Sequence, residues 1–431
     1  MLGGGARAVA RCDALGVPPY SDMAAGLYRG YLTPAHRAAV DQVGTWMAEA
    51  GMRVVIDPAA NLLGRYEGAT PEAPALIIAS HIDSVRDGGR YDGPLGVLLG
   101  IECVAALEAD GKRLPFAIEI YAFGDEEGSR FPAAMLTSRA VAGTLALDLA
   151  LIADSEGQAL AVALRRFTAD DDATVIGTAT RSREALDLTT FHTARRLSRD
   201  VLGYFEAHIE QGPILEAKGL AIGTVTGIAA QLRYQIVVAG TAGHAGTTSM
   251  PLRHDALAGA AEMVLAVEAV AFADESDLVA TVGWIEALPG AANVIPGCVR
   301  FTIDVRAGDP VRRDAAAEAI LPRLAEIAGH RGLALTIGLI HDLPASPCDP
   351  VLMDLLDAAT AAAGQPICRL VSGAGHDAMV MAALCPTAML FVRCKDGISH
   401  NPAESVDPAD VEIALTTMLG FIDRVGERFG A

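Results

Sequence analysis

The sequence predicts an α/β protein with a mixed central sheet and an inserted, smaller α+β domain of ferredoxin-like order. Near-continuous apolar runs at 75–79, 117–123 and 387–392 are typical of strands that are buried on both faces. The segment from about 214 to 342 instead alternates apolar and polar residues, as half-exposed strands do. We therefore expect a discontinuous main domain, residues 1–213 plus 343–431, interrupted by an inserted domain at 214–342.

The first elements of the main domain follow from apolar spacing. Residues 35–50 carry apolar side chains at helical spacing, and Gly51 marks the end of that helix. A second helical stripe, 96–109, lies between the apolar runs 75–79 and 117–123. This order predicts a strand–helix–strand unit within the central sheet.

The inserted domain has its own order of elements. Leu232, Tyr234, Ile236 and Val238 alternate with outward positions and predict a strand. The pattern then predicts a helix, two strands, a second helix and a last strand, near 254–272, 278–287, 298–306, 310–329 and 333–340. Strand–helix–strand–strand–helix–strand is the split βαβ order of a ferredoxin-like domain.

Composition excludes several classes of partner. The 431 residues include 33 Lys plus Arg against 53 Asp plus Glu, a formal charge of −20, which disfavours nucleic acid and anionic membranes. Mean hydropathy is positive, +0.33, but no apolar run reaches the roughly 18 residues of a spanning helix. The N-terminus lacks a signal-peptide apolar region, and the seven cysteines form an odd, scattered set. We expect a cytoplasmic protein with a small-molecule ligand.

Chemistry-bearing residues follow the apolar strands. His81 and Asp83 come directly after the strand at 75–79, where open α/β sheets build their sites, and Asp83 can fix the tautomer of the His81 imidazole. Asp92 lies in a glycine-flanked loop, where it is either the N-cap of the next helix or a ligand that offers two oxygens to two cations.

The strand at 117–123 ends in three consecutive carboxylates, Asp125 to Glu127. Their mutual repulsion is costly unless a cation or a proton offsets it. One of Glu126 and Glu127 can then bind metal while the other remains a general base. An exposed acidic turn is the alternative.

Two further histidines complete the candidate ligand set. His208 stands in Phe205–Pro213, and His400 follows the strand at 387–392. Mixed imidazole and carboxylate ligands suit zinc, manganese or cobalt better than calcium. The full set could bind two metals, with one ligand shared by both metals and four ligands that each bind one metal: His81, Asp92, Glu127, His208 and His400.

The motif string resembles the amidase/hydantoinase-carbamoylase family of aminoacylase-like dinuclear metal hydrolases, over essentially the whole chain. The motifs are S-H-I-D-S, G-G-R-Y-D-G-P-L-G-V, D-E-E-G-S-R-F, H-I-E-Q-G-P, A-G-H-A-G-T-T, A-N-V-I-P-G, S-G-A-G-H-D-A and S-H-N-P. The resemblance implies that His81 and His400 are terminal ligands on separate metals, zinc or manganese, and that Asp92 bridges them. It implies Glu126 as the catalytic base.

The resemblance also implies substrate contacts. These are His244, which would stabilise the oxyanion, and the substrate-binding residues Gln211, Asn293, Arg306, Gly373 and Ala374. A guanidinium such as that of Arg306 is a natural bidentate clamp for a carboxylate. Each of the three residues in the inserted domain has a structural alternative: His244 and Asn293 in turns, and Arg306 in a surface ion pair.

The expected activity is metal-dependent hydrolysis of a ureido C–N bond in a small carboxylated substrate. Within the family, the resemblance favours allantoate, with N-carbamoyl-L-amino acids or β-ureidopropionate as alternatives. An aminopeptidase or deacylase on the same scaffold, or a non-catalytic ureide-binding module, is less favoured. The resemblance also implies a homodimer that pairs through the inserted lid domain.

Overall fold

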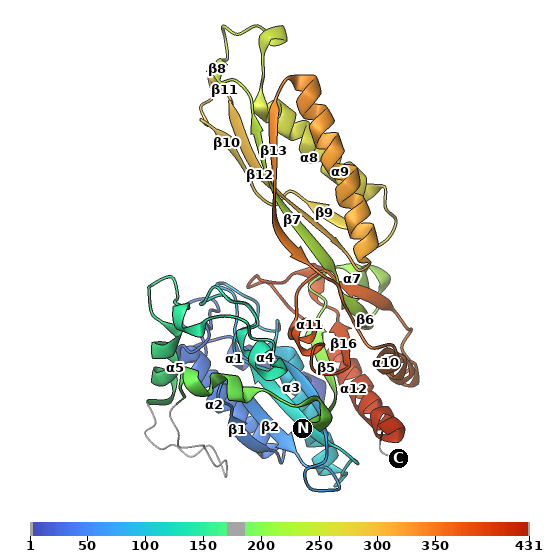
Figure 1. Ribbon diagram of the computed structural model, residues 1–431. Helices are drawn as coiled ribbons and strands as arrows, with labels where there is room; N and C mark the ends of the chain where they lie inside the picture. The colour runs from blue at the N-terminus through green and yellow to red at the C-terminus, as the bar shows by residue number, and fades with distance from the viewer. Residues whose placement is uncertain (1–2, 170–185, 430–431) are drawn as a thin grey trace. The chain divides into compact units, whose positions relative to one another are not determined.

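The computed structural model describes residues 3–169 and 186–429, which divide into two compact units (Figure 1). The second unit consists of Gly227–Pro347 with Val371–Ala374, and the first contains the rest. The second unit begins later than residue 214, because Ile214–Lys218 forms the short helix α7 and the next strand, β6 (Ile222–Ile228), pairs with the central sheet. None of the helices within these ranges is long and apolar enough to cross a membrane.

The central sheet is mixed, as predicted. Its four inner strands run parallel in the order β4-β3-β5-β16, and β1, β2 and β6 pair antiparallel to their neighbours. The short β14 pairs with β6 from the outer side, and β15 also pairs with β6. The bounds are β1 Arg53–Ile56, β2 Leu62–Tyr66, β3 Ala75–His81, β4 Ala117–Phe123, β5 Val201–Ile209, β14 Ser346–Pro347, β15 Arg369–Ser372 and β16 Thr387–Val392.

Helices cover this sheet. The buried helix α3 (Pro94–Ala109) packs on β3, β4 and β5, because most of its side chains are apolar. Helices α1 (Gly4–Leu15) and α12 (Pro408–Phe429) pack against α3, and α2 (Pro34–Glu49) packs on β1 and β2. The remaining helices of this unit are α4 Leu136–Ala142, α5 Leu160–Ala169, α6 Leu188–Phe191, α10 Pro350–Ala362 and α11 Asp377–Met381.

The second unit has the predicted ferredoxin-like order. Helices α8 (Ala256–Phe272) and α9 (Pro310–Arg331) lie side by side on one face of an antiparallel sheet, β10-β12-β7-β13, as Figure 1 shows. The strand expected at 278–287 is broken in two, and both pieces pair with β12 at different positions. The bounds are β7 Ala230–Ala239, β8 Gly243–His244, β9 Val279–Thr281, β10 Ile285–Leu288, β11 Val294–Ile295, β12 Cys298–Ala307 and β13 Ala334–Leu343.

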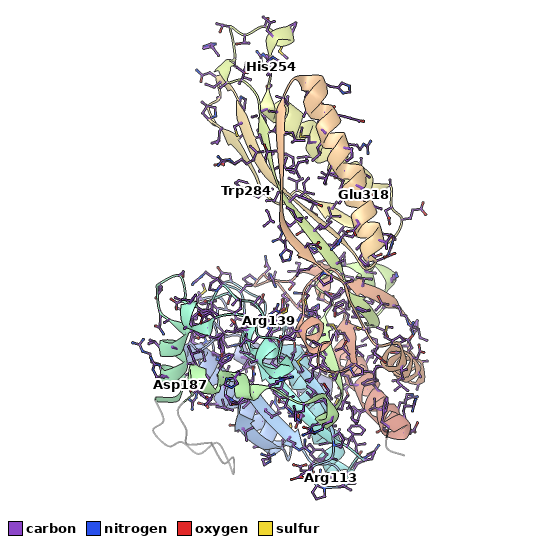
Figure 2. The ribbon with its side chains drawn as sticks, viewed as in Figure 1. Arg113, Arg139, Asp187, His254, Trp284 and Glu318 are labelled. Carbon is purple, nitrogen blue, oxygen red and sulfur yellow. The ribbon has the colours of Figure 1, made fainter. Side chains whose placement is uncertain are left out.

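The core of the second unit lies between this sheet and its two helices. Ile236 and Phe301 from the strands pack with Met263 and Leu324 from the helices. Outside this core the surface is mixed: Figure 2 shows Glu318 on α9, and Trp284 beside β10 is 45% exposed.

Candidate metal centre

The parallel strands of the central sheet bring ligand-type side chains to one edge. His81 is the last residue of β3, and His208 is the last but one of β5. Glu127 follows β4, and His400 follows β16. The carboxyl ends of parallel strands meet at one edge of a sheet, so residues more than 300 positions apart converge there.

Asp92 lies at the centre of this cluster. Its Oδ1 is 3.1 Å from Nε2 of His208 and 3.5 Å from Nε2 of His81. Its Oδ2 is 3.2 Å from Nε2 of His400, which lies 3.5 Å from Oε1 of Glu127. The five candidate ligands therefore form two groups that share Asp92: His81–Asp92–His208 and Asp92–Glu127–His400.

The imidazoles present ring nitrogens suited to metal binding. Nδ1 of His208 is 2.9 Å from the carbonyl of Ile209, and Nδ1 of His81 is 3.2 Å from the carbonyl of Asp83. Donation of both Nδ1–H groups to these carbonyls leaves a lone pair on each Nε2. The buried Nε2 of His208 has no hydrogen-bond partner, although it faces Oδ1 of Asp92. Two facing lone pairs repel each other unless a proton or a metal cation lies between them, so this donor set fits a divalent metal.

The electrostatics of the cluster distinguish Asp92 from the two glutamates. Burial opposes ionisation of Asp92, but the imidazoles of His208, His400 and His81 hold its pKa well below the ordinary value. Burial raises the pKa of Glu126 well above its ordinary value and that of Glu127 to about 7. A buried carboxyl with a raised pKa can accept and return a proton near neutral pH.

Asp83 does more than the sequence indicates. Its Oδ1 lies 3.3 Å from Nδ1 of His81. The same carboxylate also accepts the backbone N–H groups of Glu126 and Glu127, both at 3.1 Å. One fully buried side chain thus lies beside the His81 ring and fixes the loop that carries the candidate base.

Gln211 contacts the cluster directly. Its Nε2 donates to Oδ2 of Asp92 at 2.8 Å and to Oγ of Ser399 at 3.1 Å. Gln211 and His400 both have positive φ angles, 56° and 54°. Left-handed backbone at non-glycine residues costs free energy and is typical of functional sites.

In the second unit, His244 and Asn293 lie together. β8 and β11 pair antiparallel, with His244 opposite Val294, and the N–H of Ala245 donates to the carbonyl of Asn293 at 2.9 Å. His244 is exposed, and its Nδ1 accepts the N–H of Gly246 at 3.1 Å. Its imidazole therefore lies at the surface of this unit.

Arg306 lies with Gly373 near the other end of β12. Its Nε and Nη2 donate to the two oxygens of Asp304 at 2.7 and 3.1 Å, and its Nη1 donates to the carbonyl of Gly373. The adjacent Ala374 donates its N–H to Oγ of Ser372. A guanidinium has five N–H donors, so one on Nη1 and one on Nη2 are left for a carboxylate.

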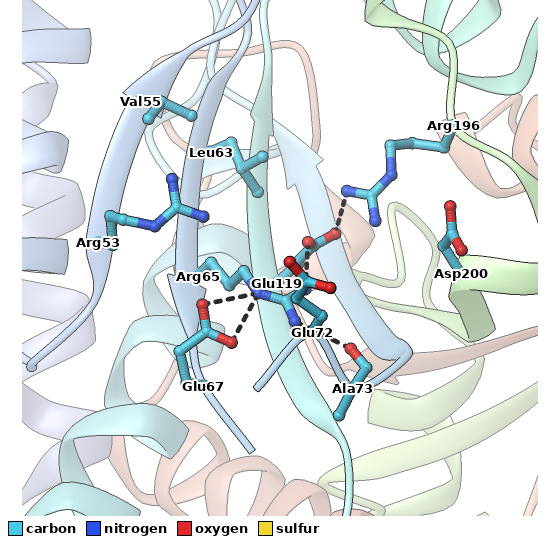
Figure 3. Close-up of a pocket in the computed structure, with 10 residues that line it drawn as sticks. All are labelled: Arg53, Val55, Leu63, Arg65, Glu67, Glu72, Ala73, Glu119, Arg196 and Asp200. Atoms are coloured by element: carbon cyan, nitrogen blue, oxygen red, sulfur yellow. Dashed lines mark hydrogen bonds and ion pairs between the residues drawn. The ribbon is translucent and has the colours of Figure 1, made fainter. Parts of the chain in front are cut away.

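A cavity of about 470 Å³ lies elsewhere in the first unit, beside β1, β2 and β4 (Figure 3). Several of its charged residues pair with each other: the buried Glu119 accepts from Arg65 at 2.8 Å and from Arg196. It shares no residue with the metal cluster, so we assign it no part in the chemistry.

Comparison with known proteins identifies the family. Residues 77–424 match the model of "Peptidase family M20/M25/M40". A hydantoinase/carbamoylase family amidase from Burkholderia multivorans has 34% sequence identity and a TM-score of 0.86, with 98% of each chain covered. This chain belongs to the hydantoinase/carbamoylase amidase family.

Two kinds of named relative are similarly near to this amidase. N-carbamoyl-L-amino acid amidohydrolase of Geobacillus stearothermophilus is 40% identical, with 88% of each chain covered. Allantoate deiminase 1 of Glycine max is 37% identical, with 97% of this chain and 89% of the relative covered. The chain is therefore an amidohydrolase of carbon–nitrogen bonds other than peptide bonds.

Sequence reasoning missed two residues of this amidase. Glu404 accepts the N–H of Asp92, and Asp304 holds the guanidinium of Arg306. The sequence signals were weak: Glu404 follows His400 by four residues, and Asp304 precedes Arg306 by two on the same strand.

Proposed function

We propose that this amidase hydrolyses the ureido C–N bond of allantoate, with N-carbamoyl-L-amino acids as the second candidate. The observation that carries the hydrolase assignment is the paired ligand cluster around Asp92, with the buried Glu126 beside it. Relatives named allantoate deiminase align over 94–97% of this chain, and those named N-carbamoyl-L-amino acid amidohydrolase over 88–91%. The larger share of this chain that aligns with the allantoate deiminases supports allantoate as the substrate.

Two divalent cations, zinc or manganese, would be held by His81, Asp92, Glu127, His208 and His400. When bound, they supply the positive charge that acidifies water and polarises a carbonyl. Glu126 is the general base: its backbone N–H is fixed by Asp83, and its buried carboxyl has a raised pKa. It takes a proton from the attacking water and returns it to the leaving nitrogen.

The remaining residues bind the substrate. The two free N–H groups of Arg306 receive the substrate carboxylate, and Gly373 and Ala374 provide backbone contacts beside it. Asn293 offers an amide donor, and His244 stabilises the developing oxyanion. Both N–H groups of Gln211 are used by Asp92 and Ser399, so Gln211 offers its buried, unpartnered side-chain oxygen as an acceptor. Water adds to the carbamoyl carbon, and the bond from that carbon to one nitrogen breaks. The carbamic acid that remains then loses its second C–N bond, so the products are the free amine, carbon dioxide and ammonia.

An ammonia-release assay on a matched panel tests this proposal. The panel contains allantoate, N-carbamoyl-L-amino acids, N-carbamoyl-β-alanine and dipeptides, each with the zinc- and the manganese-loaded protein. We expect the highest kcat/KM on allantoate. Turnover of dipeptides alone would instead indicate an aminopeptidase, and binding of a ureide without turnover would indicate a non-catalytic module.

We further propose a homodimer that pairs through the second unit. Arg306 and Cys298 stand eight residues apart on β12, roughly 27 Å at about 3.4 Å per residue, and β8 with His244 lies beyond the Cys298 end. One small substrate cannot contact His244 and Arg306 of the same chain across that distance. His244 or Asn293 of a partner subunit would therefore complete each site.

The surface of the second unit supports pairing. Leu257, Leu265 and Phe272 are exposed at a spacing that places them on one face of α8, and Phe272 is 82% exposed. Strand β13 is an edge of the described sheet and exposes Leu339 and Ile340.

All seven cysteines are free thiols, which fits the reducing cytoplasm that we propose as the compartment.

A further inference from the structure

We propose that Glu404 is a positioning residue that holds the Asp92 loop in the geometry needed to bind both metals. The proposal rests on the ligand assignment above and does not depend on which substrate is cleaved. Glu404 is buried, with 4% of its surface exposed, and lies four residues after His400. It therefore connects two chain segments that carry candidate ligands.

Glu404 accepts two hydrogen bonds from the loop that carries Asp92. Oε1 of Glu404 accepts the backbone N–H of Tyr91 at 2.8 Å and that of Asp92 at 3.1 Å. These N–H groups lie in the turn before α3, and no helix or strand bond satisfies them. A carboxylate that accepts two adjacent amides fixes the direction of that peptide, and hence the position of the Asp92 side chain.

The loop that carries Asp92 also packs closely against Glu404. A Cβ placed on Gly89 would lie 2.0 to 2.2 Å from the three carboxyl atoms of Glu404, so the loop backbone packs directly on that group. At the other end of the loop, Gly93 has a φ of 83°, and a Cβ there would lie 2.5 Å from the His81 ring. The loop is thus held between a candidate ligand and Glu404.

The second carboxylate oxygen of Glu404 contributes nothing to folding. Oε2 of Glu404 is buried and has no hydrogen-bond partner among the described residues. A buried carboxylate oxygen without a donor costs free energy, so folding alone does not favour this residue. Positioning of Asp92 accounts for it.

Metal binding by the full-length, metal-free protein tests the proposal. Zn²⁺ is titrated against a chromophoric chelator, and bound zinc is counted by elemental analysis. We expect Glu404→Ala to weaken at least one zinc site about 10- to 100-fold, as loss of a partner behind metal ligands does. Glu404→Gln keeps an oxygen acceptor for both amides, so its zinc affinity should stay within a few-fold of wild type.

Two further variants separate positioning from general stability. Gly89→Ala displaces the Glu404 carboxylate without removing it, so it should weaken the same zinc site, and it decides the question if Glu404→Ala does not fold. Glu412→Ala is the matched control, because Glu412 accepts the N–H of Gly5 at 2.7 Å, a contact with no candidate metal ligand. It should lower the thermal midpoint but leave both zinc affinities unchanged.

Unchanged zinc affinities in Glu404→Ala and Gly89→Ala, with lower thermal midpoints, would overturn the proposal and leave Glu404 a structural residue. Equal zinc losses in Glu404→Ala and Glu404→Gln would also overturn it, because the charge and not the hydrogen bonds would then matter. If the wild-type protein hydrolyses no ureide while the variants show the expected zinc affinities, the proposed function is wrong and the positioning role of Glu404 stands.

Discussion

At the scale of single residues, the partners of each carboxyl group decide what it can do at this centre. Both oxygens of Asp83 accept backbone amides, which leaves it an orienting group. Both oxygens of Asp92 face imidazole nitrogens, which suits a bridging ligand. The pKa of Glu126, raised by burial, suits proton transfer. Adjacent acidic residues therefore have separate roles.

Replacement of Glu126 by Gln should abolish turnover without loss of metal. The amide is nearly isosteric but cannot accept a proton from water, and loss of a general base typically lowers kcat about 10²–10⁴-fold. Steady-state kinetics with elemental analysis of the same sample checks this. The exposed Glu427→Gln serves as the control, and a kcat within a few-fold of wild type in Glu126→Gln would remove this residue from the base role.

Arg306→Lys should raise KM for carboxylated ureides and change kcat much less. A lysine ammonium is a point charge. It does not reproduce the two N–H donors that a guanidinium, fixed by Asp304, directs at a carboxylate. Asp304→Asn should have a smaller effect of the same kind. Asp342→Asn on β13, which weakens the pairing of Asp342 with Arg313 of α9, should not raise KM. Equal losses on an amidated substrate would show that Arg306 acts structurally.

At the scale of elements, periodicity predicts most of the fold because buried strands and amphipathic helices leave local patterns. The strands at 117–123 and 387–392 are predicted to the residue. The break between β9 and β10 is missed, because pairing with two different stretches of β12 leaves no signal in the local pattern.

Local sequence patterns also predict only part of the candidate site. Ligand-type residues that follow apolar strands, such as His81, stand out in the sequence. Glu404 does not, because its contact with Asp92 joins residues 312 positions apart and exists only in the folded chain. The second role of Asp83 is hidden for the same reason: it depends on a neighbouring strand end.

The pairing of α1 with α3 gives a prediction at this scale. The carboxylate of Glu102 on α3 is fully buried and accepts from Arg7 and Arg11 of α1. We expect Glu102→Gln to lower the free energy of unfolding by about 2 kcal/mol, since it removes one partner of a buried network whose arginines are partly exposed. Urea unfolding of metal-loaded protein measures this. Glu108→Gln on the same helix, which breaks the surface pair with Arg113, should cost less than about 0.5 kcal/mol.

At the scale of the whole molecule, metal content and stability should be linked. The ligand cluster collects three imidazoles and two carboxylates from distant parts of the chain, so bound cations stabilise the folded state relative to the unfolded chain. We expect two divalent metals per active chain and a lower thermal midpoint after chelation, restored by added zinc or manganese. Full activity with one metal per chain in elemental analysis would contradict the two-metal assignment.

The shared-site dimer makes a prediction about mixtures of inactive chains. Glu126→Gln and His244→Ala should each be inactive as pure dimers. After subunit exchange, a mixed dimer contains one site that combines the intact Glu126 of one chain with the intact His244 of the other. Random pairing makes about half of the dimers mixed, and each mixed dimer has one intact site out of two. Recovery should therefore approach about a quarter of wild-type activity.

The control for this experiment is a mixture of Glu126→Gln with Glu127→Gln. Both changes lie in the same unit of the chain, within two consecutive residues of one loop, so no exchange of subunits brings an intact pair together. That mixture should stay inactive at every ratio. If mixed dimers of Glu126→Gln and His244→Ala form, as shown by tagged chains that copurify, and still release no ammonia, each chain has a self-contained site. His244 would then act within its own chain or not at all, and the roughly 27 Å between the ends of β12 would exclude a substrate contact shared with Arg306.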